Sequence, residues 1–397
     1  MRLGAKLLEM NFTEIEHLEE QFQLATYAKM HIAAERGAGA WIWTSEGNKY
    51  LDLYGGHAVC ATGHCHPHVV ESVKQQAEKM LFYSNLVYSD VRAQAAEKLV
   101  SVAPESLTKA FFCNSGTEAN ENAMRMARMA TSREKIITFS GGFHGRTADA
   151  ISATFLGKYR ELGRPNVPGH VCAEFGNLES VRNLADKTVA AIFLEPIQSM
   201  AGVAEAAPEF FTGLREICNQ NGICLIFDEV QTGMGRTGNW FFGGSDLAGG
   251  VVPDIITLAK SLGSGVPVGA CLVNDCIAEK IKINDLGTTF GGGMLAMAAV
   301  RATLEAIETD EMLENAKMVE NHLRERLNEI SNVVRLRGRG CLLGIEFAEN
   351  AKNIHARLLE EKIITGTSSE PNVLRLLPPL CVKTDEIDLL IETLKTI

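Results

Sequence analysis

The sequence predicts an α/β protein, in which a large domain with a mainly parallel central sheet between helices carries a smaller α+β domain. The middle of the chain alternates short, continuously apolar runs with helical segments, a pattern typical of parallel strands buried on both faces. The C-terminal part instead combines charged helices with short strands. No linker or repeat separates the two, so we expect the large domain over 57–295 and the small domain from 1–56 and 296–397.

The N-terminal segment predicts a helix followed by a pair of strands. Apolar side chains recur at near-helical spacing across 6–30, which indicates an amphipathic helix. Apolar runs at 41–43 and 50–53 flank the sequence Ser-Glu-Gly-Asn at 45–48, which is a turn signal between two strands.

The rest of the chain supplies the other predicted elements. Strands are expected at 110–113, 135–139, 190–194, 223–227, 255–259, 333–336, 344–347 and 373–376. Helices are expected at 116–130, 208–219 and 294–330, and Pro208 suits the first position of the second helix.

Charge and composition exclude several classes of protein. Among 397 residues, 38 basic against 49 acidic side chains give a net charge of −11, which argues against nucleic acid or a membrane surface as the main partner. No apolar run approaches the roughly 20 residues of a membrane span, and the acidic N-terminus lacks the layout of a secretory signal. The ten cysteines are scattered, which suits reduced thiols. We therefore expect a cytoplasmic enzyme.

The turn after strand 110–113 is a candidate anion site. Ligands of parallel sheets bind beyond the carboxyl ends of the strands, and here Asn114-Ser115-Gly116-Thr117 leads directly into a helix. Free N–H groups at a helix N-terminus favour an anion, typically phosphate. The alternative is ordinary capping of the helix by Asn114 or Ser115.

Two other predicted strands end in ionisable residues. Asp228 follows 223–227 and could hold a cationic ring nitrogen or a metal, or simply cap a helix or form a surface ion pair. Lys260 ends the run 255–260, where burial would lower its pKa and suit it to covalent bonding with a carbonyl. A lysine that only extends its amine to solvent is the alternative.

The three features together fit pyridoxal 5'-phosphate. The phosphate of this cofactor needs N–H donors, its ring nitrogen needs an anionic partner and its aldehyde needs a lysine. Each feature is ambiguous alone, but their order along one parallel sheet favours this cofactor.

Two other motifs lack the context that their usual functions require. Residues 233–238 match the dinucleotide-binding pattern G-x-G-x-x-G, but they neither follow a strand directly nor open a helix, so a nicotinamide dehydrogenase rests on this string alone. The Cys and His residues of 60–68 lack the spacing of a closed structural metal site, so no metal is expected.

A set of motifs in this order resembles the class III, fold type I aminotransferases. The matching segments are FFCNSGTEANE at 111–121, GFHGRT at 142–147, LEPIQ at 194–198, FDEVQTG at 227–233, PDIITLAK at 253–260, TTFGG at 288–292 and LRLLPPL at 374–380. They run from about residue 25 to the C-terminus, so the resemblance covers nearly the whole chain and is specific as a set.

The resemblance implies the residues that bind the cofactor. They are Ser115, Gly116, Thr117, Phe143, Glu195, Asp228, Gln231, Lys260 and Thr289. Lys260 would bind the aldehyde and carry the proton, Asp228 would keep the ring nitrogen protonated, and Gln231 would contact the ring hydroxyl. Phe143 would stack on the ring. Thr289 would come from the partner subunit of a homodimer, so that each site is shared between two subunits.

The resemblance also implies the substrates, which are a small-molecule amino donor and the pair 2-oxoglutarate and glutamate. The substrate-binding residues would be Tyr27, Arg146, Thr288 and Arg375. Arg146 would bind one carboxylate as a bidentate pair and Arg375 the second carboxylate of 2-oxoglutarate. The nearest members act on N-acylornithine, acetyl or succinyl, in arginine biosynthesis.

Two departures from the family pattern concern the donor. Met200 occupies the position of a glutamate that usually masks the second arginine, and Gly293-Met294 replaces Asn-Pro. We therefore expect an acylated ornithine rather than free ornithine. Ornithine, 4-aminobutyrate, an internal aminomutase reaction and a non-catalytic relative are the alternatives.

Overall fold

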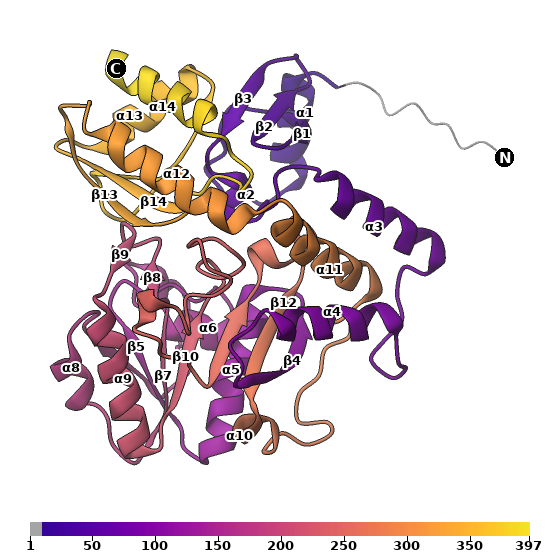
Figure 1. Cartoon of the computed structure of the whole chain (residues 1–397), viewed down its shortest axis with the longest axis vertical. Helices are drawn as coiled ribbons and strands as arrows, with labels where there is room; N and C mark the ends of the chain where they lie inside the picture. Colours follow the sequence, from indigo (N-terminus) through magenta and orange to yellow (C-terminus); the bar gives the residue numbers. More distant parts are fainter. Residues whose placement is uncertain (1–9) are drawn as a thin grey trace.

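A seven-stranded sheet forms the centre of the larger part of the molecule (Figure 1) in the computed structural model, which describes residues 10–397. Its spatial order is β4 (Leu107–Cys113), β12 (Gly269–Asn274), β11 (Ile255–Leu258), β10 (Cys224–Asp228), β7 (Val189–Leu194), β5 (Lys135–Phe139) and β6 (His170–Ala173). β12 pairs antiparallel with both neighbours, and the other strands of this sheet run in one direction. The mainly parallel sheet predicted from the apolar runs is confirmed.

Both faces of this sheet are buried, as continuous apolar strands require. Along β10, Leu225 packs in one apolar cluster with Leu214 of α9 (Pro208–Asn221). Its neighbour Ile226 packs in a second cluster with Ala123 of α5 (Gly116–Thr131). Because side chains alternate along a strand, Asp228 lies on the face toward α5, and Glu229 faces away from it.

The remaining elements surround this sheet and build the smaller part. The other helices are α1 (Phe12–Phe22), α2 (Gly55–Ala58), α3 (Pro67–Lys79), α4 (Asp90–Ser101), α6 (Ala148–Ala153), α7 (Tyr159–Leu162), α8 (Leu178–Arg182), α10 (Asp275–Ala278), α11 (Met294–Thr309), α12 (Met312–Leu327), α13 (Ala351–Glu360) and α14 (Thr384–Thr396), with 3-10 turns η1 (Asp246–Ala248) and η2 (Lys260–Gly263). The other strands are β1 (Ala34–Ala38), β2 (Trp41–Thr44), β3 (Lys49–Asp52), β8 (Ile197–Gln198), β9 (Ala204–Glu205), β13 (Val333–Arg339), β14 (Leu342–Phe347), β15 (Ile363–Ile364), β16 (Gly366–Thr367) and β17 (Val373–Leu376).

Two four-stranded sheets combine the ends of the chain. One has the order β1–β2–β3–β15 and the other β13–β14–β17–β16. Since β15 pairs in parallel with β3, N-terminal and C-terminal segments share one sheet. The limits of the two domains stay a prediction.

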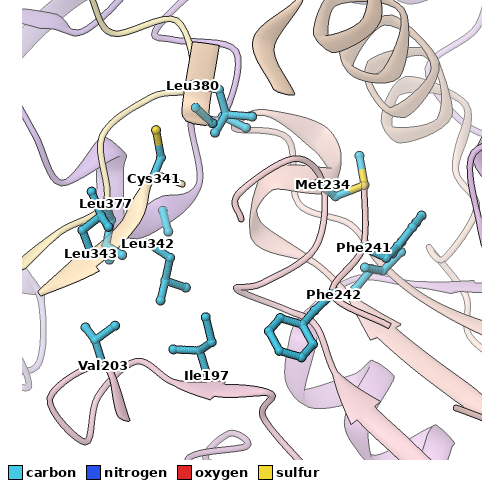
Figure 2. Close-up of a cluster of buried hydrophobic side chains, with 14 of the residues drawn as sticks. Ile197, Val203, Met234, Phe241, Phe242, Cys341, Leu342, Leu343, Leu377 and Leu380 are labelled. Carbon is cyan, nitrogen blue, oxygen red and sulfur yellow. The ribbon is translucent and has the colours of Figure 1, made fainter. Parts of the chain in front are cut away.

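An apolar cluster joins the C-terminal sheet to the loops of the central sheet. Figure 2 shows Leu342 and Leu343 of β14 near Ile197 and Val203, and Phe242 belongs to the same cluster. All of these side chains are almost fully buried. Because β14 pairs with β17, this packing fixes β17 and its Arg375 relative to the carboxyl edge of the central sheet.

Two predicted helices differ from the structure. The helix expected over 6–30 begins at Phe12 and ends at Phe22, and its first predicted residues, 6–9, lie outside the described part. Asn11 caps it, and no residue of α1 is fully buried, although the Phe12 ring packs edge-on against His31 with 4.5 Å between ring centres. The helix expected over 294–330 is two helices, because Glu311 adopts a left-handed backbone with φ 52°.

None of the helices between residues 10 and 397 combines the length and apolar character needed to cross a lipid bilayer.

Candidate active site

A cavity of about 370 Å³ opens at the carboxyl edge of the central sheet. Residues that directly follow β4, β7, β10 and β11 line it, which is where parallel sheets bind ligands. It brings together eight of the sequence-predicted residues: Ser115, Gly116, Thr117, Phe143, Glu195, Asp228, Gln231 and Lys260.

The turn between β4 and α5 offers free backbone donors to this cavity. The first backbone bond of the helix runs from Ala119 N to Ser115 O (3.0 Å), so the N–H groups of Gly116 and Thr117 precede it. Ser115 does cap the helix, accepting a bond from Glu118 N (3.3 Å). Capping and anion binding are therefore compatible, because the cap uses the N–H group of Glu118 and leaves those of Gly116 and Thr117 for an anion. The dipole of α5 adds partial positive charge at this turn, which therefore suits a phosphate.

Asp228 is a buried carboxylate held by three hydrogen-bond partners. Its Oδ2 accepts bonds from Asn120 Nδ2 and from His144 Nδ1, both at 2.8 Å. Its Oδ1 accepts a bond from Val230 N (3.1 Å). These bonds aim the carboxylate at the cavity, where it can pair with a protonated ring nitrogen.

Lys260 is a buried amine at the end of β11. Burial lowers the pKa of its amine, and the nearby carboxylates of Asp228 and Glu195 partly offset that shift. Its backbone is left-handed, with φ 36°, an unfavourable conformation for a lysine that surrounding structure must maintain. The neutral form of an amine attacks a carbonyl, and burial favours that form by lowering the pKa.

Glu195, at the end of β7, is a third ionisable group of the cavity. Its Oε1 accepts a bond from Phe143 N (2.8 Å), which fixes the loop that carries the Phe143 ring. Burial, and then the charge of Asp228, raise the pKa of the Glu195 carboxyl well above its ordinary value.

The other predicted residues lie outside the cavity lining. Arg375 is buried on β17, while Arg146 is exposed with its guanidinium 5.1 Å from the centre of the Tyr159 ring, which Phe143 also contacts. Thr288 Oγ1 accepts a bond from Asn114 Nδ2 (3.0 Å) beside the phosphate-type turn. Thr289 and Tyr27 are exposed and reach no part of the cavity within this chain.

Three residues near Asp228 were not anticipated from the sequence. Asn120 lies one helical turn after Gly116, and Thr257 Oγ1 donates to its Oδ1 (2.6 Å). His144 follows Phe143, is fully buried and packs on Phe193 with 4.1 Å between ring centres. The i to i+4 spacing of Gly116 and Asn120 could have indicated a shared helix face.

The histidines of the cluster at 60–68 lie within hydrogen-bond distance of carboxylates, and His64 pairs with Asp52. His66 Nε2 lies 3.0 Å from Asp310 Oδ2, and His68 Nε2 lies 2.7 Å from Glu305 Oε2. Within residues 10–397, no three His, Cys, Asp or Glu side chains gather closely enough to hold a metal ion. Residues 233–238 form turns and no helix follows them, so the dinucleotide-binding context is absent there.

Comparison with known proteins supports the same chemistry. The sequence profile of the family described as aminotransferase class-III matches residues 23–397. The chain belongs to the class III aminotransferases. This class III enzyme is 40% identical over 375 residues to an acetylornithine aminotransferase of Archaeoglobus fulgidus, covering 94% of this chain and 97% of that one. It is 41% identical over 379 residues to the protein of the same name from Methanopyrus kandleri, covering 94% and 96%.

Solved structures show the same fold. The class III chain superposes on the ornithine aminotransferase of Toxoplasma gondii with a TM-score of 0.90 and 27% identity, covering 98% of this chain and 94% of that one. The acetylornithine aminotransferase of Elizabethkingia anophelis gives a TM-score of 0.84 at 27% identity, with 98% of both chains covered. The predicted fold type and family are confirmed, and the chain is a transaminase that uses pyridoxal 5'-phosphate.

The cavity fits this cofactor. Gln231 Oε1 is buried with no hydrogen-bond partner among the described residues, and it belongs to the cavity lining, where a ring hydroxyl can donate to it. The phosphate-type turn, the Asp228 carboxylate and the Lys260 amine supply the three other groups that the cofactor needs.

Proposed function

We propose that this enzyme transfers the δ-amino group of an N-acylated ornithine, acetyl or succinyl, to 2-oxoglutarate. The products are the N-acylated glutamate semialdehyde and glutamate. The shared name of the relatives, acetylornithine aminotransferase, supports the acylated donor. We place the reaction in arginine biosynthesis in the cytoplasm. The observation that carries the choice of substrates is the environment of Arg375.

Arg375 is a buried cation with neutral partners. Its guanidinium donates to Thr367 O (2.7 Å), to Ser199 Oγ (3.1 Å) and to the Tyr54 hydroxyl (2.7 Å). Only 3% of the residue is exposed, and no carboxylate of residues 10–397 lies within ion-pair distance of it. A buried, unpaired guanidinium is costly, so a substrate carboxylate that pairs with it gains binding energy.

The neighbours of Arg375 also bear on the amine donor. Ser199 contacts the guanidinium, and the next residue, Met200, brings no charge to mask it. A donor with an added acid or carbonyl can therefore use the same guanidinium that the dicarboxylate acceptor uses. This supports an acylated ornithine, and N-succinylornithine above N-acetylornithine if the added carboxylate reaches Arg375.

Residues of the chain itself supply proton transfer, cofactor binding and carboxylate binding. Bound pyridoxal phosphate supplies an electron sink for the negative charge that develops on the amine-bearing carbon. Lys260 can accept a proton at Nζ and return it, and burial suits it to this role by lowering the pKa of its amine. Asp228 keeps the ring nitrogen protonated, the N–H groups of Gly116 and Thr117 hold the phosphate, and Arg146 binds a substrate carboxylate.

A panel of amine donors with 2-oxoglutarate tests this function. We expect kcat/KM for N-acetylornithine and N-succinylornithine to exceed that for ornithine and 4-aminobutyrate by about tenfold or more, equal to roughly 1.4 kcal/mol of transition-state binding. A clear preference for free ornithine, or product formation without 2-oxoglutarate, would contradict the proposal. Arg375→Gln should abolish any preference for the succinyl over the acetyl donor.

We also propose that the enzyme acts as a homodimer with shared sites. The segment 80–88 exposes a continuous apolar surface, which we call the 80s face: Met80, Leu81, Phe82, Tyr83, Leu86, Val87, Tyr88 and, packed against it, Phe290. Exposed apolar surface of this extent favours coverage by another protein.

The 80s face is joined to the loop 288–292, which lies beside the phosphate-type turn. Asn85 Nδ2 donates to Gly291 O (2.8 Å), and Arg92 Nε donates to Gly292 O (2.9 Å). That loop carries Thr288, which contacts Asn114, and the exposed Thr289. A second copy seated on the 80s face would therefore bring Thr289 of the partner subunit near the phosphate-type turn.

Replacing Leu86 and Tyr88 together by aspartate should convert the dimer into monomers in sedimentation velocity and weaken cofactor retention. Both side chains are almost fully exposed in the single chain, so the change should leave folding intact. Leu389→Asp, at an exposed leucine of α14 outside the 80s face, is the matched control. A double variant that stays dimeric and fully active would exclude this face as the interface.

A further inference from the structure

Asp52 is a buried carboxylate outside the cavity that organises a neighbouring turn. Its Oδ1 accepts bonds from Tyr54 N and Gly55 N, both at 2.9 Å, and its Oδ2 accepts one from Gly56 N (3.1 Å). Oδ2 also lies 2.7 Å from His64 Nε2. Only 5% of the Asp52 side chain is exposed, so these four partners replace the water that would otherwise solvate its carboxylate.

The turn that Asp52 holds is left-handed throughout. The φ angles are 55° at Gly55, 58° at Gly56, 69° at His57 and 63° at Ala58. Glycine tolerates this conformation, but for His57 and Ala58 it costs about 1–2 kcal/mol per residue. Consecutive N–H groups that point at one carboxylate offset that cost, since each bond to a charged acceptor is strong.

This turn contacts the active site on two sides. The Tyr54 hydroxyl accepts a bond from Arg375 Nη2 (2.7 Å). At the other end of the turn, Ala58 O accepts a bond from Ser261 Oγ (3.0 Å), and Ser261 is the neighbour of Lys260 in the chain. A change in the turn would therefore move the hydroxyl that orients the Arg375 guanidinium.

His64 is rigidly placed to support Asp52. Its backbone exchanges two bonds with Gly39, N to O at 2.8 Å and O to N at 3.1 Å. Its side chain packs so closely on Gly37 that a Cβ there would lie 2.6 Å from His64 Cβ. The hydrogen bond to Asp52, followed by that to Cys60, raises the pKa of His64 to about 10.

We propose that the Asp52–His64 pair positions the carboxylate site of Arg375, by holding the left-handed turn that presents the Tyr54 hydroxyl. Asp52 and His64 act only through Tyr54 and touch no substrate. The inference rests on the proposed role of Arg375 in binding the second carboxylate of 2-oxoglutarate.

The test uses the holoenzyme with His64→Ala, His64→Gln and His68→Ala. The last is a matched control, because His68 makes the same kind of bond to Glu305 on the exposed surface. We expect His64→Ala to raise KM for 2-oxoglutarate about tenfold, as for a lost bond to a charged group, while its single-turnover rate with ornithine, which carries no acyl group to reach Arg375, stays within about twofold. His64→Gln keeps a donor and should restore most of the affinity.

Calorimetric titration with glutarate, a dicarboxylate without a keto group, gives a readout independent of turnover. We expect His64→Ala to bind it about tenfold more weakly than the wild type, and His68→Ala to bind it as the wild type does. Equal losses in both half-reactions, or unchanged glutarate binding in His64→Ala, would overturn the inference while leaving the proposed function standing. Failure of the wild type to bind glutarate would instead refute the role of Arg375 and, with it, this inference.

Discussion

Lys260→Ala is expected to lower transaminase activity by at least about 10⁴-fold, because the variant loses both covalent and proton-transfer catalysis. The structure leaves no substitute in the cavity, since the other ionisable side chains that line it are His144, Glu195 and Asp228. The variant should fold, because alanine removes a buried amine and the strain of a left-handed backbone remains the same. Single-turnover assays with excess enzyme measure the loss.

Lys135→Ala is the matched control for this variant. Lys135 begins β5, so it lies at the amino ends of the strands, opposite the cavity. It pairs with Asp186 on the surface (3.4 Å). Its replacement should leave kcat unchanged. If Lys260→Ala kept a tenth or more of the wild-type rate, the covalent role of Lys260 would be wrong.

Asp228→Asn is expected to lower kcat by a hundred- to thousandfold, about the loss seen when one preorganised electrostatic partner is removed from a reacting centre. The amide keeps the size of the side chain and can still accept one of the bonds from Asn120 or Val230. It carries no charge, so the ring nitrogen loses the anion that holds its proton. The cofactor should also dissociate more readily, which absorbance of the filtered protein measures.

Glu229→Gln separates this electrostatic effect from general disturbance of the strand end. Glu229 is the next residue, is equally buried, and accepts bonds from Phe242 N (2.6 Å) and Gly243 N (2.8 Å) on the opposite face. Its replacement should reduce the thermal midpoint but leave the activity per folded molecule within a fewfold of the wild type. Comparable losses of kcat in the two variants would contradict a specific role for Asp228.

Most of the central sheet could be predicted because strands buried on both faces leave continuous apolar runs. The run 223–227, for example, became β10 (Cys224–Asp228), and 135–139 became β5 without a shift. No strand was predicted at β12, and its direction was not predictable either, since an antiparallel strand inside a covered sheet is as apolar as its parallel neighbours. The break at Glu311 carries neither Gly nor Pro, and tertiary packing of α11 and α12 sets it.

The strand-end residues of the site could be predicted for the same topological reason. Asp228 and Lys260 follow adjacent parallel strands, so their side chains meet at one edge. The spacing of Asn120 indicates only the helix face that it shares with Gly116, and the contacts of Asn120 and His144 with Asp228 could not be predicted, because they depend on how that helix and a loop are oriented in the fold. The role of the Asp52 carboxylate could not be predicted either, since its partners include backbone N–H groups of a turn that only the fold defines.

Borohydride reduction of the enzyme reconstituted with pyridoxal 5'-phosphate, followed by peptide mass spectrometry, tests the central claim most directly. The account predicts a stable pyridoxyl group on the peptide that contains Lys260 and on no other lysine. An unlabelled Lys260 in protein that has bound the cofactor, or a label on a different lysine, would contradict it.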